Sequence, residues 1–252
     1  MKRLVIISDL HCGHYTGLTH PDYQKVKGQF TEVQKTMWNW YAEKIQNQNH
    51  IDFLMVNGDA IKGKEEKSGG TELITSDRHM QCLIAKAAID YAHADKVGII
   101  YGTPYHTGTD EDWEATLSDM VNADILGSHE WIDLEGVIID FKHKVSSSVI
   151  PHGRHTGPSR AGLWNLLWNE RGLQPKADII VRSHVHYHTF CGTPERLIIT
   201  TPGLQGWTKY GAKECEGTID IGFIVIDAEN GRYEWKAELM QLDFLARQAF
   251  KV

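Results

Sequence analysis

The chain has 252 residues, of which 41% are hydrophobic and 23% are charged, with a formal net charge of −7 and a pI of about 6.0. This length suits one large α/β domain, predicted over residues 1–252. Because the chain is acidic overall, no global field would draw it to nucleic acid or to an anionic membrane, and a phosphate-bearing substrate would need local positive charge. No stretch approaches the roughly 18 apolar residues of a membrane span, and the first apolar run is too short for a signal peptide.

The first predicted strand ends in an acid that is followed by a histidine. Residues 4–7 are four consecutive apolar residues, typical of a strand buried on both faces, and Asp9-Leu10-His11 follows them. An Asp and a His at this spacing can aim an oxygen and a nitrogen at one metal ion, and such strand ends are where open α/β folds place ligands. Taken alone, the stretch is equally compatible with a turn that has a capping Asp.

The remaining elements alternate strand and helix in the first half of the chain and are mainly strands in the second half. Helices are predicted over residues 31–46, 80–91, 112–122 and 160–170, the last with Ser159 as its N-cap. Strands are predicted at residues 51–56, 97–101, 131–134, 137–141, 179–181, 197–201, 219–226 and 233–239. The polar, glycine-bounded stretch 62–70 is expected to be a solvated loop.

Cysteine usage indicates the redox environment. Cys12, Cys82, Cys191 and Cys215 are far apart and form no C-x-x-C pair. In a chain of this length, such spacing predicts reduced thiols and a cytoplasmic location.

Five of the predicted strands end in potential metal ligands. These are Asp9 with His11, Asp59, the loop 103–106, His143, and His184 with His186. Carboxylate and imidazole together suit Mn, Fe, Zn or Co, and the absence of paired cysteines argues against a structural zinc site. This many ligands suits two ions roughly 3.5–4 Å apart, an arrangement that is used for in-line displacement at phosphorus.

The order of these blocks resembles that of the calcineurin-like metallophosphoesterases, which run D-x-H, G-D, G-N-H-D/E, a lone His and G-H-x-H. The corresponding stretches here are Asp9-Leu10-His11, Gly58-Asp59, Gly102-Thr103-Pro104-Tyr105-His106, His143 and Ser183-His184-Val185-His186. The resemblance implies a four-layer α/β/β/α sandwich with two mixed β-sheets. It also implies two divalent metal ions, with Mn preferred and Fe, Zn, Co, Ni or Mg as alternatives.

The resemblance further implies a role for each residue of these blocks. Asp9, His11 and His186 would bind one metal ion, Asp59 would bridge both ions, and His143 and His184 would bind the second. In that family a metal-bridging hydroxide attacks phosphorus, and a histidine of the third block protonates the leaving oxygen or stabilises its charge; His106 is the candidate here. Paired cations suit this chemistry because they lower the pKa of bound water and neutralise the charge that develops on phosphoryl oxygens.

The third block departs from the family pattern. Where the family has an Asn ligand, this chain has Thr103 or Tyr105, depending on where two extra residues are placed. His106 is therefore either the acid or a metal ligand, and Thr103 could contribute only its backbone or its hydroxyl. The Gly-Thr-x-x-His form resembles a divergent branch of the family that is met in phage and prophage genes.

Several other side chains leave alternatives open. For the lone histidine, His143 directly after a strand is preferred over His152 or His155 in the following loop. Trp207 and Tyr210 follow a late strand and could either line the pocket or pack in the core.

The predicted function is that of a metal-dependent hydrolase acting on a phosphodiester or a phosphomonoester. A nuclease of the same fold is the alternative, and a catalytically lapsed scaffold is a further one, supported only by the missing Asn. The predicted partner is therefore a small phosphate ester or a nucleic-acid strand, with no membrane. His14 and His188 lie beside the ligand blocks and could contact the substrate, although a position in a surface loop is the preferred interpretation for each.

Overall fold

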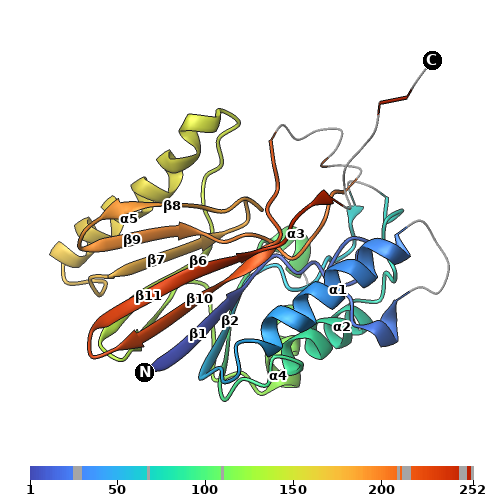
Figure 1. Cartoon of the computed structure of the whole chain (residues 1–252), viewed down its shortest axis with the longest axis horizontal. Helices are drawn as coiled ribbons and strands as arrows, with labels where there is room; N and C mark the ends of the chain where they lie inside the picture. Colours follow the sequence, from blue (N-terminus) through green and yellow to red (C-terminus); the bar gives the residue numbers. More distant parts are fainter. Residues whose placement is uncertain are drawn as a thin grey trace.

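The computed structural model describes residues 1–24, 30–66, 69–108, 111–208, 211, 217–243 and 249–250. Two β-sheets pack face to face, with α1, α2 and α4 on the outer side of one sheet and α5 on the outer side of the other (Figure 1). This is the four-layer α/β/β/α sandwich that the family resemblance implied. No helix in the described ranges is long and apolar enough to cross a membrane.

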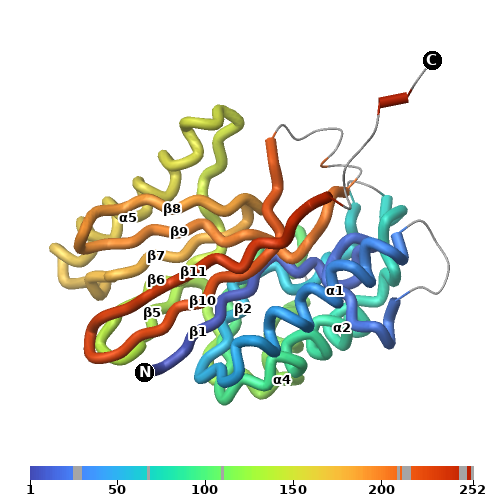
Figure 2. The backbone as a smooth tube through the Cα atoms, in the orientation of Figure 1, coloured from blue at the N-terminus to red at the C-terminus, as the bar shows by residue number. Residues whose placement is uncertain are grey.

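The first sheet has six strands in the order β11-β10-β1-β2-β3-β4. Its parallel strands are β1 (Lys2–Ile7), β2 (Phe53–Asn57), β3 (Val97–Ile100) and β4 (Ile125–Gly127), and its antiparallel pair is β10 (Gly222–Glu229) with β11 (Arg232–Leu239). The earliest strand therefore lies beside one of the last (Figure 2). Because β1, β2 and β3 are parallel, their carboxyl ends meet at one edge of the sheet.

The second sheet has five strands in the order β5-β6-β7-β9-β8. Its strands are β5 (Glu130–Leu134), β6 (Val137–Lys144), β7 (Ile179–Ser183), β8 (Thr189–Thr193) and β9 (Arg196–Thr200), and β6, β7 and β9 run parallel. Neither β4 nor β8 was predicted. Both are short edge strands whose residues are half-buried or exposed, so they carry no apolar run.

Four helices begin and end within four residues of their predicted bounds, whereas the one-turn α3 (Pro104–Thr107) lies in the stretch that was predicted to be the loop 103–106. The four are α1 (Thr31–Gln46), α2 (Arg78–Asp90), α4 (Trp113–Val121) and α5 (Thr156–Glu170), and short 3₁₀ turns lie at Pro21–Tyr23 and Pro151–His155. Asp112 caps α4 by accepting from the Ala115 N–H. The prediction that Ser159 caps the following helix was wrong. A 3₁₀ turn runs directly into α5, so Ser159 lies inside the helix.

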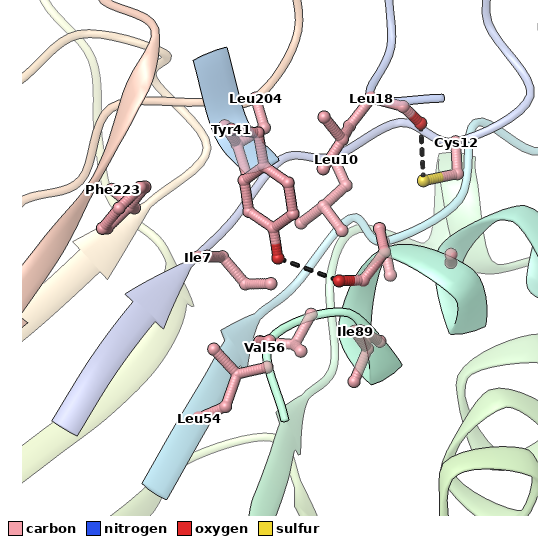
Figure 3. Packing of buried hydrophobic residues seen from close by; sticks show 14 of the residues in the cluster. Ile7, Leu10, Cys12, Leu18, Tyr41, Leu54, Val56, Ile89, Leu204 and Phe223 are labelled. Carbon is pink, nitrogen blue, oxygen red and sulfur yellow. Dashed lines mark hydrogen bonds between the residues drawn. The ribbon is translucent and has the colours of Figure 1, made fainter. Parts of the chain in front are cut away.

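The side chains of β1 fill the core on both faces of the first sheet. Val5 and Ile7 belong to the cluster that packs against the helices, whereas Leu4 and Ile6 belong to the cluster between the two sheets. Within the helix-side cluster the Tyr41 hydroxyl of α1 donates to the carbonyl oxygen of Ala88 in α2 at 2.9 Å (Figure 3). Close packing on both faces fixes the strand and therefore fixes the position of the residues at its end.

Candidate metal centre

The predicted ligands gather where the carboxyl ends of β1, β2, β6 and β7 meet, and most of them have an unusual backbone conformation. Asp9, His11, Asp59, His184 and His186 have φ angles of 50°, 45°, 52°, 77° and 53°. A left-handed conformation costs a non-glycine residue roughly 1–2 kcal/mol. Strain of this kind persists where the surrounding structure enforces it, and it concentrates at functional sites. The backbone here is shaped to present side chains.

The first group consists of Asp9, His11 and His186. His186 Nε2 lies 3.4 Å and His11 Nε2 lies 3.9 Å from Asp9 Oδ1, and the two ring nitrogens are 3.1 Å apart. Burial lowers the pKa of both histidines, so both rings are neutral, which is the form that binds a metal. Asp9 Oδ1 is buried and forms no hydrogen bond in the described part of the chain. One carboxylate, with a buried oxygen that has no hydrogen-bond partner, and two imidazoles form a ligand set that fits a divalent cation.

The second group is centred on Asp59. Its Oδ2 lies 3.0 Å from His143 Nε2 and 4.0 Å from His184 Nδ1. Burial alone would raise the pKa of Asp59, but the neighbouring His143, together with His184 and His106, holds it well below its usual value. Burial would likewise lower the pKa of His143, yet Asp59 and Asp9 raise it to about 10. The buried carboxylates of Asp59 and Asp9 thus stabilise positive charge at this position, as a cation site requires.

Asp59 belongs to more than one group, as a bridging ligand would. A further candidate group joins it to His11 and His106, whose Nε2 lies 3.9 Å from Asp59 Oδ2. The other oxygen, Oδ1, accepts from the Thr103 backbone N–H at 2.7 Å and from the Thr103 hydroxyl at 3.1 Å. Thr103 therefore contacts Asp59 with both groups that the sequence left as alternatives, and it fixes the orientation of that carboxylate.

Backbone carbonyls orient two of the histidines. His143 Nδ1 lies 2.7 Å from the carbonyl oxygen of Asn57, and His106 Nδ1 lies 2.8 Å from that of Lys62. A carbonyl only accepts, so each Nδ1 carries a proton and each Nε2 faces the site. Metal-binding histidines are oriented in this way. The sequence did not reveal these carbonyl contacts, because any residue type can supply a carbonyl.

Close approach explains the glycines of the second and third blocks. A Cβ on Gly58, where φ is +87°, would lie 2.3 Å from His143 Nδ1, and one on Gly102 would lie 2.1 Å from Asp59 Oδ1.

The Gly102 N–H donates to Glu114 Oε2 at 2.8 Å. Burial, followed by the charge of Asp59, raises the pKa of Glu114 to about 8. The sequence did not identify Glu114, since nothing local distinguishes it from other helix residues.

A separate buried cluster consists of His14, Glu65 and Glu72. His14 Nε2 lies 3.1 Å from Glu65 Oε1 and 3.9 Å from Glu72 Oε2. However, His14 Nδ1 accepts from the Thr16 backbone N–H at 3.0 Å, so the ring proton sits on Nε2 and faces Glu65. The predictions that His14 is a surface residue and that residues 62–70 form a solvated loop were wrong at these positions. His14, Lys62 and Glu65 are buried by contacts distant in sequence.

The remaining candidate histidines lie outside these groups. Among the described residues, His152 and His155 belong to no candidate metal group, and His155 contacts the Thr189 hydroxyl at 2.8 Å. His188 Nδ1 donates to the carbonyl oxygen of Thr200 at 2.9 Å. The structure therefore brings His143, rather than the loop histidines, to the other predicted ligands.

The candidate centre lies in a pocket of about 920 Å³. Its lining includes the cationic side chains Lys62, Lys142, Lys144 and Arg154 and the aromatic side chains Tyr101, Tyr105, Tyr187 and Trp207. The acidic chain thus gathers positive charge around the candidate centre. Trp207 lines this pocket, whereas Tyr210 and Cys215 lie outside the described residues; Cys12, Cys82 and Cys191 are free thiols.

The architecture and the strand-end site together define the calcineurin-like metallophosphoesterase fold. The chain matches no family model and no curated protein sequence. Among solved structures it is similar to an archaeal phosphodiesterase, at 14% identity over 94% of this chain and 99% of that one, with a TM-score of 0.50. It is equally similar to wild-type Vps29 from Entamoeba histolytica in complex with Zn²⁺, at 14% identity over 94% of this chain and 98% of that one, with a TM-score of 0.50. At such identities the likeness shows the fold and not the activity.

Proposed function

We propose that this chain is a two-metal phosphoesterase that hydrolyses a phosphodiester or a phosphomonoester. The observation that carries the proposal is the sharing of Asp59 between two candidate metal groups whose histidines line a pocket of about 920 Å³. That volume is within the range of roughly 300–1,000 Å³ that is typical of small-molecule sites. The archaeal phosphodiesterase of the same fold adds support at the level of reaction class.

We assign ligands to each of two proposed ions. Asp9, His11 and His186 would hold one ion, His143 and His184 would hold the other, and Asp59 would contact both. When bound, such a pair of divalent cations lowers the pKa of coordinated water and neutralises the charge on phosphoryl oxygens. Manganese is the preferred occupant because mixed carboxylate and imidazole ligands suit it.

The chain's own residues prepare the pocket for this reaction. Thr103 donates to Asp59 Oδ1 through its backbone N–H and through its hydroxyl, which also lies 3.3 Å from Oδ2, and Oδ2 faces His143 at 3.0 Å. Lys62 lines the pocket and places a cation beside the site, where it can attract a phosphate group. Thr103 therefore orients the Asp59 carboxylate, and Lys62 supplies positive charge, before a substrate binds.

His106 is the proposed group for the leaving oxygen. Its Nδ1 donates to the carbonyl oxygen of Lys62, so its Nε2 is turned toward Asp59 and the pocket. Burial lowers the pKa of His106, so the ring rests in the neutral form with its lone pair on Nε2. It can therefore accept at Nε2 the proton that the attacking water loses and donate it to the leaving oxygen, as general acid–base catalysis requires.

The test uses the purified full chain after removal of metals with a chelator. Reloading with Mn²⁺ is expected to restore hydrolysis of bis(p-nitrophenyl) phosphate, of p-nitrophenyl phosphate, or of both, and metal analysis is expected to find about two ions per chain. A loaded sample that hydrolyses neither ester would contradict the proposal. A chain that purifies and reloads with little metal would instead favour the scaffold alternative.

A further inference from the structure

A second cavity, of about 340 Å³, lies between β6 and α5 on the outer face of the second sheet. Because α5 packs on β7, β8 and β9, the outer face of β6 stays open beside it. One face of α5 lines the cavity, with residues that recur at three- and four-residue steps: Gly157, Arg160, Ala161, Trp164, Asn165 and Trp168. The opposite wall includes Lys142 and Lys144 of β6 and Arg182 of β7.

The charge of this cavity is predominantly positive. In the described part of the chain, no carboxylate pairs with Lys142, Lys144 or Arg160, and both lysines are exposed. The acid in the lining, Asp140, is already bound by Arg182 at 2.6 Å and by His129 at 3.0 Å. Three uncompensated cations in a chain with a net charge of −7 indicate an anionic ligand.

The cavity also has aromatic walls. Trp164 and Trp168 are one turn apart on the same face of α5, and 53% of Trp164 is exposed. A tryptophan ring beside unpaired cations is the combination that proteins use for single-stranded nucleic acid, in which bases stack on aromatic rings while phosphates contact Lys and Arg. A phosphate ion or a sugar phosphate has no base that could stack on the rings of Trp164 and Trp168.

The second cavity is connected to the metal centre through β6. Lys142 and Lys144 line both cavities, and His143 lies between them in sequence. Since neighbouring side chains of a strand point to opposite faces, His143 turns to the metal centre while the lysines turn toward the outer face. A strand with one phosphate at the metal centre could therefore continue across the end of β6 past the two lysines that line both cavities.

We propose that the cavity between β6 and α5 is a nucleotide-binding subsite for a single-stranded nucleic acid whose reacting phosphate lies at the metal centre. The subsite rests on the proposed phosphoesterase function and narrows its substrate class to an oligonucleotide. The volume of about 340 Å³ suits one nucleotide with its base against Trp164, and it does not admit a duplex. The phosphates on either side of this nucleotide would contact Lys142, Lys144 and Arg160.

The test measures binding of a fluorescein-labelled oligothymidylate to the metal-free full chain in EDTA, so that nothing is cleaved. Trp164→Ala is expected to raise the Kd about tenfold, and Trp164→Tyr is expected to restore most of the affinity because it restores a stacking ring. The double variant Lys142→Ala/Lys144→Ala is expected to weaken binding and to reduce the slope of log K against log salt by about 0.7 per lysine. Leu163→Ala is the matched control, since Leu163 is exposed on α5 but does not line the cavity.

The outcomes separate this inference from the proposed function. Unchanged affinity in Trp164→Ala, an unchanged salt slope in the double-lysine variant, or equal competition by duplex DNA would overturn the subsite. A chain that hydrolyses small diesters but binds the oligonucleotide no better than thymidine monophosphate would also overturn it while leaving the phosphoesterase proposal intact. Strand binding without hydrolysis of any ester would overturn the phosphoesterase proposal, and with it the reacting phosphate at the metal centre, and would leave the cavity as a strand-binding site only.

Discussion

Two buried pairs of a histidine and a carboxylate have nearly the same composition. One is Asp59–His143 of the candidate metal centre, and the other is His14–Glu65 of the separate cluster. In each pair a ring Nε2 lies 3.0–3.1 Å from a carboxylate oxygen. In each pair the acid also has a left-handed backbone, with φ of 52° at Asp59 and 53° at Glu65. Residue type, burial and strain therefore do not distinguish them.

The other ring nitrogen does distinguish them. His143 Nδ1 donates to a carbonyl oxygen, whereas His14 Nδ1 accepts from a backbone N–H. The first arrangement can release Nε2 to a cation, while the second keeps a proton on Nε2 for Glu65. Binding a metal through Nε2 of His14 would require the neutral ring to lose its only proton. The comparison teaches that a metal site is recognised by the partner of the distal nitrogen as well as by its ligands.

The largest expected effect comes from Asp59→Asn, which keeps the shape of the side chain and removes the shared charge. Loss of a partner that only supports a metal ligand costs about 10–100-fold, so loss of the shared ligand itself should lower kcat/KM for bis(p-nitrophenyl) phosphate by more than about 100-fold and lower the metal content. Glu65→Gln is the matched control and should leave the metal content unchanged. Equal metal loss in both variants would contradict the claim that the Asp59 cluster binds metal and the Glu65 cluster does not.

His106→Ala should have the next largest effect, and its size should depend on the leaving group. A general acid contributes about 10²–10⁴-fold when the leaving oxygen is basic and much less for p-nitrophenolate. Rates are compared for an alkyl ester and a p-nitrophenyl ester, with metal content measured in parallel. A uniform loss across leaving groups, accompanied by lost metal, would instead make His106 a ligand.

Gly58→Ala tests the close approach that forms the second block. Gly172 also has a left-handed φ, of +69°, but open space around it, whereas a Cβ on Gly58 meets the His143 ring. Gly172→Ala should therefore lower the free energy of unfolding by about 1 kcal/mol through backbone strain alone. Gly58→Ala should lower it further and reduce activity about tenfold by displacing His143. Equal destabilisation, with activity retained, would show that the ring tolerates the shift.

Thr103→Val should reduce activity about tenfold, because it removes the hydroxyl contact to Asp59 while retaining the backbone contact. Thr103→Ser preserves the hydroxyl and serves as the control. If the valine variant matches the wild type in kcat/KM, the backbone N–H alone orients the carboxylate.

The smallest effect on activity is expected from His14→Gln. Because this change disrupts a buried pair away from the proposed ligands, it should lower the free energy of unfolding by about 1–3 kcal/mol and leave metal content and kcat nearly unchanged. Denaturant unfolding and metal analysis check this together. Stability equal to that of the wild type, combined with lost metal, would reverse the assignment of the two clusters.

Much of the fold could be predicted because its central elements have strong local signals. The apolar runs of β1 and β2 and the periodic helix α1 are visible in the sequence, and the ligand blocks follow such strands. The edge strands β4 and β8 have no comparable run, so they were missed. The burial of Lys62, Glu65 and Glu114 could not be predicted either. These polar side chains are buried by contacts with residues distant in the chain, which no local pattern shows.

The most direct test of the central claim is anomalous X-ray diffraction from crystals of the full chain loaded with Mn²⁺. The account predicts two peaks that share the Asp59 carboxylate, one beside His11 and His186 and the other beside His143 and His184. It predicts no peak beside His14. Absence of both peaks, or a peak at His14 in their place, would contradict the account.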